Sequence, residues 1–469
     1  MKISKLVALI TVFLITATTA IATKGIEAES SADYQVTAQT SDSFVESLGI
    51  GTKFGYCPGR LCDNYSEVKA LLAQLGIRYI RDIPFPEPWR IRTNLYQDHG
   101  IQMLAEAGRT WGKPLDLENI SARLNAIKSW GEMIVGIVGV NEYDNPTYHF
   151  CEETEGCDPD WSEENWSVNY LQFQQRLYDR VKADSKLRHL PVVMGPMAHL
   201  DNLEELDEDD LDAICDRGND HSYPGAWGKP SQESGWGEKA TVRSMDEVVT
   251  KVQRVCPGKI WITETGYEET TEDRNQYFVT RQAKAKYLPR IYANYYLQQD
   301  IERTFLYELL NATKTGTSFG IIDTNLKPTP AYYAIKNMIS LLEEATWNKS
   351  TQSWKYPDFK PDRLEYTLEG NTTDVRHLLL QKSDGTFYLL IWQEVYAYDN
   401  KTGKDLVNRD RQIEFKLNGS TLEKANKYLL YNESNPATEL LPLKTWTNIS
   451  NLSLNIPDHI LILEFTLKN

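Results

Sequence analysis

The feature that most constrains this chain is a regular alternation of short apolar segments with amphipathic helical patterns between residues 48 and 344. The first helical pattern, over 66–75, places four apolar residues on one face before Gly76: Val68, Leu71, Leu72 and Leu75. The apolar run over 133–140 is typical of a strand buried on both faces. Close to eight such βα units fit, which predicts a (β/α)8 TIM barrel over 48–344. An open doubly wound sheet is the alternative, and it fits less well because no glycine-rich phosphate loop follows any of these segments.

The pattern changes after Glu344. Short β-type runs then follow one another without a useful helical period, over 375–380, 387–392, 412–417, 427–431 and 460–465. Asp384-Gly385 marks a hairpin turn between the first two. We predict an antiparallel β-sandwich over 345–469. It is either a carbohydrate-binding module or a structural brace, and the lack of a long flexible linker favours the brace.

The N-terminus predicts export. A basic start, an apolar run over 6–15 and Ala20-Ile21-Ala22 together indicate a signal peptide over 1–22, followed by an extension over 23–47. An uncleaved membrane anchor is the alternative, but the apolar run is short for a span. We expect a secreted or extracellular protein, with the periplasm or cell surface also compatible, and no transmembrane segment in the mature chain.

Six cysteines, at 57, 62, 151, 157, 215 and 256, fit an oxidising compartment. Their spacing favours the pairs Cys57/Cys62, Cys151/Cys157 and Cys215/Cys256 over a zinc site, although the sequence leaves the connectivity open. The chain has seven histidines and none in an H-x-H pair, so we expect neither a metal nor a cofactor.

The net charge of −16 makes phosphate backbones and anionic membranes poor partners, because the average field repels them. It also weakly disfavours substrates rich in uronic acids or sulfate. We expect no nucleic-acid partner, and a monomer.

Two carboxylates each come first after a buried apolar run: Glu142 in Asn141-Glu142 and Glu264 in Thr263-Glu264. Chemistry in such barrels lies at the carboxyl ends of the strands, so we expect both side chains there. A pair of carboxyl groups in different protonation states is what cleavage of an acetal requires. Arg81, at the end of the second predicted strand, could keep one of them ionised.

The order Asn141-Glu142, then His221-Ser222-Tyr223, then Glu264 resembles the clan A glycoside hydrolases, and families 5 and 39 most. The resemblance covers the barrel. It implies that Glu142 is the general acid/base and Glu264 the nucleophile of a retaining β-glycosidase. The carboxyl groups should then stand about 5–5.5 Å apart.

The resemblance also implies binding roles. Asn141 would bind the sugar 2-hydroxyl, Tyr223 would hydrogen-bond the nucleophile and His221 would shape the pocket, while Arg81 matches an arginine of family 5. Arg81 could instead be a structural ion-pair partner, and His221 a satisfied core histidine.

Two positions depart from family 5. Glu106 stands where a histidine usually follows strand three, and Tyr307-Glu308 stands where a tryptophan usually ends strand eight. We count Tyr307 and Glu308 as candidate substrate-binding residues, with a purely structural role as the alternative.

Tryptophans are frequent in segments that follow predicted strands: Trp89, Trp111, Trp161, Trp166, Trp227 and Trp236. Flat aromatic rings bind the apolar faces of sugars, so we expect about half of these to line subsites, Trp111 and Trp227 among them. They favour an extended, endo-acting site. The rival to an enzyme acting on an extracellular oligo- or polysaccharide is a non-catalytic carbohydrate-binding surface protein on a hydrolase scaffold, but such a protein usually loses one of the two glutamates.

Overall fold

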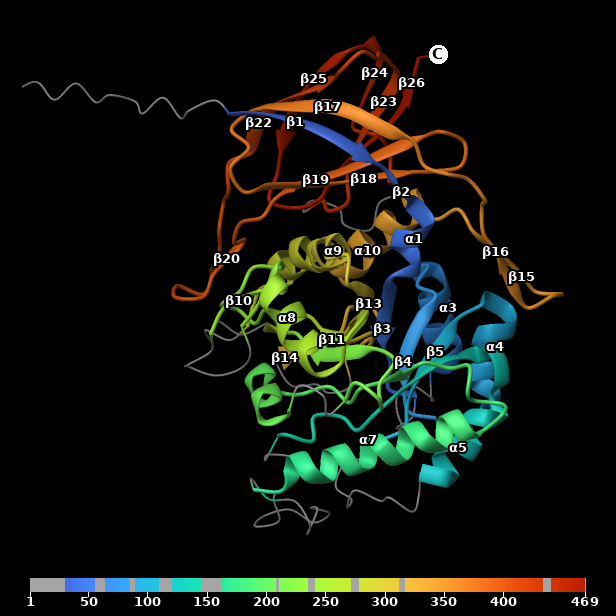
Figure 1. The fold of residues 1–469 in the computed structure, drawn as a ribbon. Helices are drawn as coiled ribbons and strands as arrows, with labels where there is room; N and C mark the ends of the chain where they lie inside the picture. The colour runs from blue at the N-terminus through green and yellow to red at the C-terminus, as the bar shows by residue number, and fades with distance from the viewer. Residues whose placement is uncertain are drawn as a thin grey trace, which may run out of the picture.

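The computed structural model describes residues 30–54, 64–84, 89–108, 120–145, 162, 164–207, 211–234, 241–270, 278–311, 317–432 and 440–468 (Figure 1). The predicted signal peptide and the cysteine pairs at 57/62 and 151/157 lie outside these residues. In the described part of the chain, no helix is both long and apolar enough to cross a membrane.

Eight parallel strands form the barrel that the sequence predicts. They are β3 (Leu48–Gly51), β4 (Tyr79–Asp82), β5 (Gln102–Glu106), β6 (Ile134–Val138), β7 (Val192–Val193), β8 (Gly218–His221), β11 (Ile260–Thr265) and β13 (Ile301–Leu306). Each pairs with its neighbour in chain order, and β13 returns to pair with β3. A parallel bridge between Val193 and Arg217 joins β7 to the start of β8 and closes the ring.

Helices cover the outside of this ring (Figure 1): α3 (Tyr65–Leu75), α4 (Trp89–His99), α5 (Ile120–Ser129), α7 (Trp166–Ala183), α8 (Met245–Val255), α9 (Arg281–Leu297) and α10 (Pro330–Leu342). Local chemistry sets their ends. Gly76 follows α3 with a φ of 82°, which glycine adopts without steric penalty. Ser244 and Glu247 form a capping box at the start of α8.

Large apolar side chains fill the barrel interior, in a cluster of Tyr79, Leu104, Val138, Val193, Trp261 and Phe305. Gly136 makes room for this packing, because a Cβ there would lie 2.9 Å from the Trp261 ring. The interior is therefore a packed core, which leaves the strand ends as the place for chemistry.

Two antiparallel sheets form the C-terminal sandwich. One contains β1 (Ser30–Thr37), β17 (Arg363–Gly370), β22 (Arg411–Leu417) and β25 (Asn451–Ile456). The other contains β2 (Gln39–Thr40), β18 (Val375–Gln381), β19 (Phe387–Gln393), β26 (Leu461–Leu467), β23 (Leu422–Leu429) and β24 (Lys444–Ile449), with only β2 parallel to its neighbour. The 30–40 segment, before the barrel in sequence, thus adds a strand to each sheet.

The larger sheet lies over α9 and α10 (Figure 1) and is buried on both faces at β19. Leu389 and Ile391 point into the sandwich core, whereas Leu390 and Trp392 belong to the core of the barrel side. This alternation follows from the two-residue period of a strand. The sandwich and the barrel consequently share an apolar interface.

The least strand-like of the predicted segments, just before His221, is a strand nevertheless. Asn219 is fully buried there, donates to the carbonyl of Met194 and accepts from the Thr263 amide. These side-chain hydrogen bonds to the neighbouring strands on both sides stabilise β8, which lacks the apolar side chains that usually favour a strand. Nearby, Cys215 and Cys256 form the expected disulfide.

Candidate active site

The two glutamates singled out in the sequence meet at the carboxyl ends of the barrel strands. Glu264 lies within β11, and Glu142 follows β6. Three atoms lie within 4.8 Å of one another: a carboxylate oxygen of Glu142, a carboxylate oxygen of Glu264 and a ring nitrogen of His221. The side chains of Glu142 and Glu264 are 14% and 12% exposed, so both are largely shielded from water but still reachable.

Hydrogen bonds from two directions hold Glu264. The Arg81 guanidinium donates to Oε1, and the Tyr223 hydroxyl donates to Oε2 at 2.7 Å. Burial raises the pKa of Glu264, but attraction to His221 and Arg81 and these hydrogen bonds outweigh it, so the pKa lies below the ordinary 4.5. Glu264 is therefore an ionised, oriented carboxylate, which is what a nucleophile requires.

Glu142 has a different environment. Its Oε1 lies 2.5 Å from His221 Nδ1, and the other ring nitrogen of His221 lies 3.2 Å from the Thr263 hydroxyl. Its backbone φ is 44°, in the left-handed region that a residue with a Cβ seldom adopts. Strain of this kind at a strand end is common where a functional side chain must be aimed. The Glu142 amide donates to the Pro196 carbonyl at 3.0 Å, which helps hold this conformation.

Arg81 connects three strand ends. Besides Glu264, its Nη2 donates to Asn141 Oδ1 at 2.5 Å and lies 3.1 Å from Glu106 Oε2. Burial and the charge of Glu264 raise the pKa of Glu106, although Arg81 opposes them. Glu106 was predicted only as a departure from a family pattern. Its position as an acid at the end of a buried run, shared with the catalytic candidates, was the signal that it belongs to the site.

Aromatic rings continue the site toward the eighth strand. Phe319 makes edge-to-face contacts with Tyr223 and Tyr307, with ring centroids 5.6 and 5.3 Å apart. Next to Tyr307, Glu308 pairs with Lys53, whose Nζ lies 2.9 Å from Oε2. Lys53 follows β3 and was not among the sequence-predicted site residues.

The predicted tryptophans are less closely tied to the site. The carbonyl of Trp227 accepts from the Tyr396 hydroxyl of the sandwich at 3.1 Å. Trp166 is 3% exposed and donates to Glu205, so it packs within the fold and does not line a sugar subsite. Trp111 lies outside the described residues.

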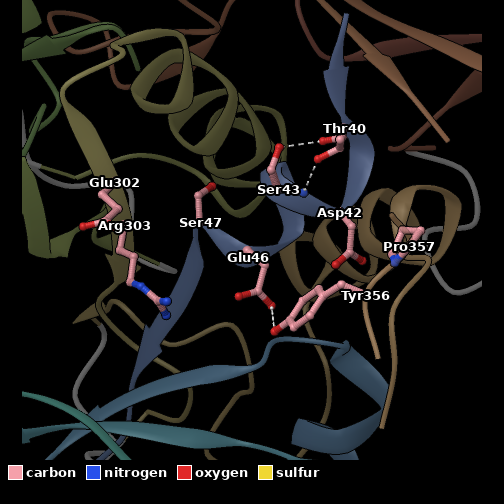
Figure 2. Close-up of a pocket in the computed structure, with 9 residues that line it drawn as sticks. All are labelled: Thr40, Asp42, Ser43, Glu46, Ser47, Glu302, Arg303, Tyr356 and Pro357. Atoms are coloured by element: carbon pink, nitrogen blue, oxygen red, sulfur yellow. Dashed lines mark hydrogen bonds between the residues drawn. The ribbon is translucent and has the colours of Figure 1, made fainter. Parts of the chain in front are cut away.

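A separate pocket of about 350 Å³ lies at the opposite end of the barrel (Figure 2). It is bordered by Ser47, just before β3, and by Glu302 and Arg303 at the start of β13. Glu46 in this pocket accepts from the Tyr356 hydroxyl at 3.0 Å and from Arg78 at 2.7 Å. The amino-terminal ends of barrel strands serve stability in this architecture, and we assign this pocket no part in the chemistry.

The chain is similar to several solved structures. A family 39 glycoside hydrolase from the gut symbiont Bacteroides cellulosilyticus WH2 matches with a TM-score of 0.57 at 15% sequence identity, over 90% of this chain and 82% of that chain. An endo-β1,6-glucanase matches at 0.47 and 11% identity, over 92% of both chains. A calcium-binding mutant of Bacteroides uniformis β-glucuronidase 2 matches at 0.43 and 12%, over 90% of this chain and 48% of that one.

No protein-family profile and no curated protein matches the sequence. The family 39 match confirms the predicted architecture, a barrel followed by a sandwich.

Proposed function

We propose that this chain, which has the fold of a family 39 glycoside hydrolase, is a secreted retaining enzyme that cleaves β-glycosidic bonds in an extracellular oligo- or polysaccharide. The observation that carries the proposal is the approach of Glu142 and Glu264 to within 4.8 Å across the barrel mouth. The two come from strands that are not neighbours, and they have different hydrogen-bond partners.

In the first step, the Glu264 carboxylate attacks the anomeric carbon while Glu142 gives its proton to the departing glycosidic oxygen. Arg81 and Tyr223 hold Glu264 in position, so little reorganisation is needed when the bond forms. In the second step, Glu142 removes a proton from water, which attacks the anomeric carbon and releases Glu264. Separations of about 5–5.5 Å suit this route, whereas inversion leaves room for a water at about 6.5–9.5 Å.

Glu142, His221 and Glu264 also have the separations of a three-ligand cation site. The Arg81 guanidinium, always charged, already lies against Glu264 and opposes a second cation there. We therefore expect hydrolysis to be insensitive to chelators.

The decisive experiment replaces each glutamate by glutamine. E264Q should lower kcat/KM for aryl β-glycosides by more than about 10⁴-fold, since the nucleophile is lost. E142Q should retain turnover of substrates with good leaving groups and regain activity with azide, because azide needs no general base. Glu132, exposed at the opposite end of β6, provides the matched control E132Q, which should behave as wild type.

Full activity of E264Q would contradict the assignment of the nucleophile. A wild-type protein that binds glycans and hydrolyses none of them would instead support the non-catalytic alternative.

A further inference from the structure

The ends of the first and eighth strands carry a charged pair that the mechanism above does not use. Lys53 follows β3 by two residues, and Glu308 follows β13 by two. The two strands are hydrogen-bonded neighbours, and the Leu309 amide donates to the Gly51 carbonyl at 3.0 Å just where the pair stands. The pair therefore lies on the same end of the barrel as the catalytic glutamates.

We infer that Lys53 and Glu308 form hydrogen bonds with hydroxyl groups of the sugar bound next to Glu264, and that they favour an uncharged sugar over a uronic acid. This rests on the proposed function and adds the substrate class to it.

The position of Glu308 supports a role next to the reacting sugar. β13 is the direct neighbour of β11, which carries Glu264, and the charge of Glu264 acts on the Glu308 carboxyl. Tyr307, one residue earlier, reaches Tyr223 through Phe319. Lys53 Nζ lies 4.8 Å from the centre of the Tyr307 ring, so the ammonium, the ring and the carboxylate form one wall.

This wall has the chemistry to recognise hydroxyl groups. Lys53 contacts Oε2 of Glu308, and within the described part of the chain no hydrogen bond occupies Oε1. A sugar hydroxyl can donate to that carboxylate and accept from the ammonium, and adjacent hydroxyls can do both at once. The side chain of Lys53 is 29% exposed, which leaves the ammonium accessible.

The charges around the anomeric position disfavour an acidic sugar. Three cations, Arg81, Lys53 and the fully buried Lys284, act on the carboxyl groups of Glu106, Glu264 and Glu308, and Glu142 adds a fourth carboxyl group. Arg81 and Lys53 are each already paired with a carboxylate, and Lys284 is out of reach of a ligand. A uronate would therefore bring a further negative charge to a site whose cations are already neutralised by carboxylates, whereas a neutral hydroxyl adds no charge.

The test measures kcat/KM of the wild type, E308Q and K53M on 4-methylumbelliferyl β-glycosides. The neutral substrates are the glucoside, galactoside, mannoside, xyloside, cellobioside and laminaribioside, and the acidic substrate is the glucuronide. The wild type should prefer a neutral sugar. Each variant should lower kcat/KM for that sugar by about 10- to 100-fold, the effect of losing a hydrogen bond to a charged group, and should change the ranking among the neutral sugars.

Lys128 provides the matched control. It pairs with Asp184 at 2.9 Å and is 28% exposed, and it lies on the outer helix α5. K128M should leave the ranking of substrates unchanged. A purely structural Lys53–Glu308 pair would make K53M and E308Q lower Tm with the ranking unchanged, and that result would overturn the inference, as would a wild type that prefers the glucuronide.

These failures differ from failure of the proposed function. If the wild type hydrolyses neutral glycosides and E308Q has the same kcat/KM, only the inference about Lys53 and Glu308 is wrong. If the wild type hydrolyses none of these glycosides and no β-glucan or xylan, both the inference and the proposed function are wrong.

Discussion

Arg81 stands among three side chains that arrive from three other strand ends: Asn141, Glu264 and Glu106. Its guanidinium is fixed in shape and permanently charged, so it can orient several acceptors at once. A lysine at this position would supply the charge but not the several N–H donors that the planar guanidinium holds in a fixed arrangement. The geometry of Glu264, the proposed nucleophile, therefore depends on a residue that need not touch the substrate.

Tyr223 allows the electrostatics of Glu264, the proposed nucleophile, to be tested separately. Y223F removes the 2.7 Å hydrogen bond to Glu264 and keeps the ring that contacts Phe319. Without this donor the pKa of Glu264 should rise, so the acid limb of kcat/KM should move to higher pH, because Glu264 must be ionised to attack. We expect kcat/KM to fall about 10-fold or more at its optimum.

The control is Y332F, which removes a hydroxyl on the outer helix α10 that donates to the Leu71 carbonyl on α3. Its pH profile should match the wild type. An unshifted acid limb in Y223F would mean that Tyr223 does not stabilise the ionised nucleophile.

Residue order could predict most of the contacts at the site but not all. Asn141, Glu142, His221, Tyr223 and Glu264 were predicted because an unusual order of residue types marks them. Lys53 and Glu308 could not be paired from the sequence, since the closure of the ring, which brings the first strand beside the last, is what joins them.

Among the elements, apolar runs identified most barrel strands, and bonding between strands accounts for the exceptions. β8 is polar and still a strand, because Asn219 bonds to both neighbours. β1 was not predicted as a strand, since its partner β17 lies beyond the whole barrel in the sequence. Period-two patterns indicate a strand only when its environment has two different faces.

His377 on β18 makes one element sensitive to pH. Its ring packs 4.4 Å from that of Tyr34 on β1 and bonds to the Tyr366 hydroxyl at 2.9 Å. Burial lowers its pKa from 6.5 to about 4. The unfolded chain therefore binds a proton between these values while the folded chain does not, so stability falls as the pH drops from about 6.5 to about 4.

We expect this residue to account for up to ~3 kcal/mol of that loss. H377Q cannot take up the proton, so the difference in unfolding free energy between wild type and variant should change across this window and stay constant above pH 7. Denaturant titrations at pH 7.5, 6 and 4.5 measure it. A constant difference at all three would show that His377 is not the group responsible.

For the whole molecule, the sandwich and the barrel are joined by a buried ionic network as well as by apolar contact. Glu394, after β19, accepts from Arg290 at 3.1 Å and Asn294 at 3.0 Å, both on α9, and from Trp392 at 2.8 Å. Its other oxygen accepts at 3.0 Å from the amide of Ser231, in the segment that follows the His221–Tyr223 sequence. The sandwich is thus connected to a loop of the active-site end, as a brace would be.

E394A should destabilise the protein by about 3–5 kcal/mol, because it leaves the Arg290 charge buried without its carboxylate partner. Calorimetry should show the loss in a transition that includes both parts of the chain. E423A, at an exposed position on β23 of the same sheet, should stay within about 0.5 kcal/mol of wild type. Equal stabilities of the two variants would show that the network does not join the parts.

The pairing of β1 with β17 also has a consequence for how the polypeptide matures. A ribosome releases Tyr34 early and its neighbour Tyr366 late, with the entire barrel emerging between them. β1 must therefore wait for its partner β17 until the barrel between them has been made, and their pairing joins a segment made before the barrel to one made after it. Order of synthesis and order of assembly differ in this protein.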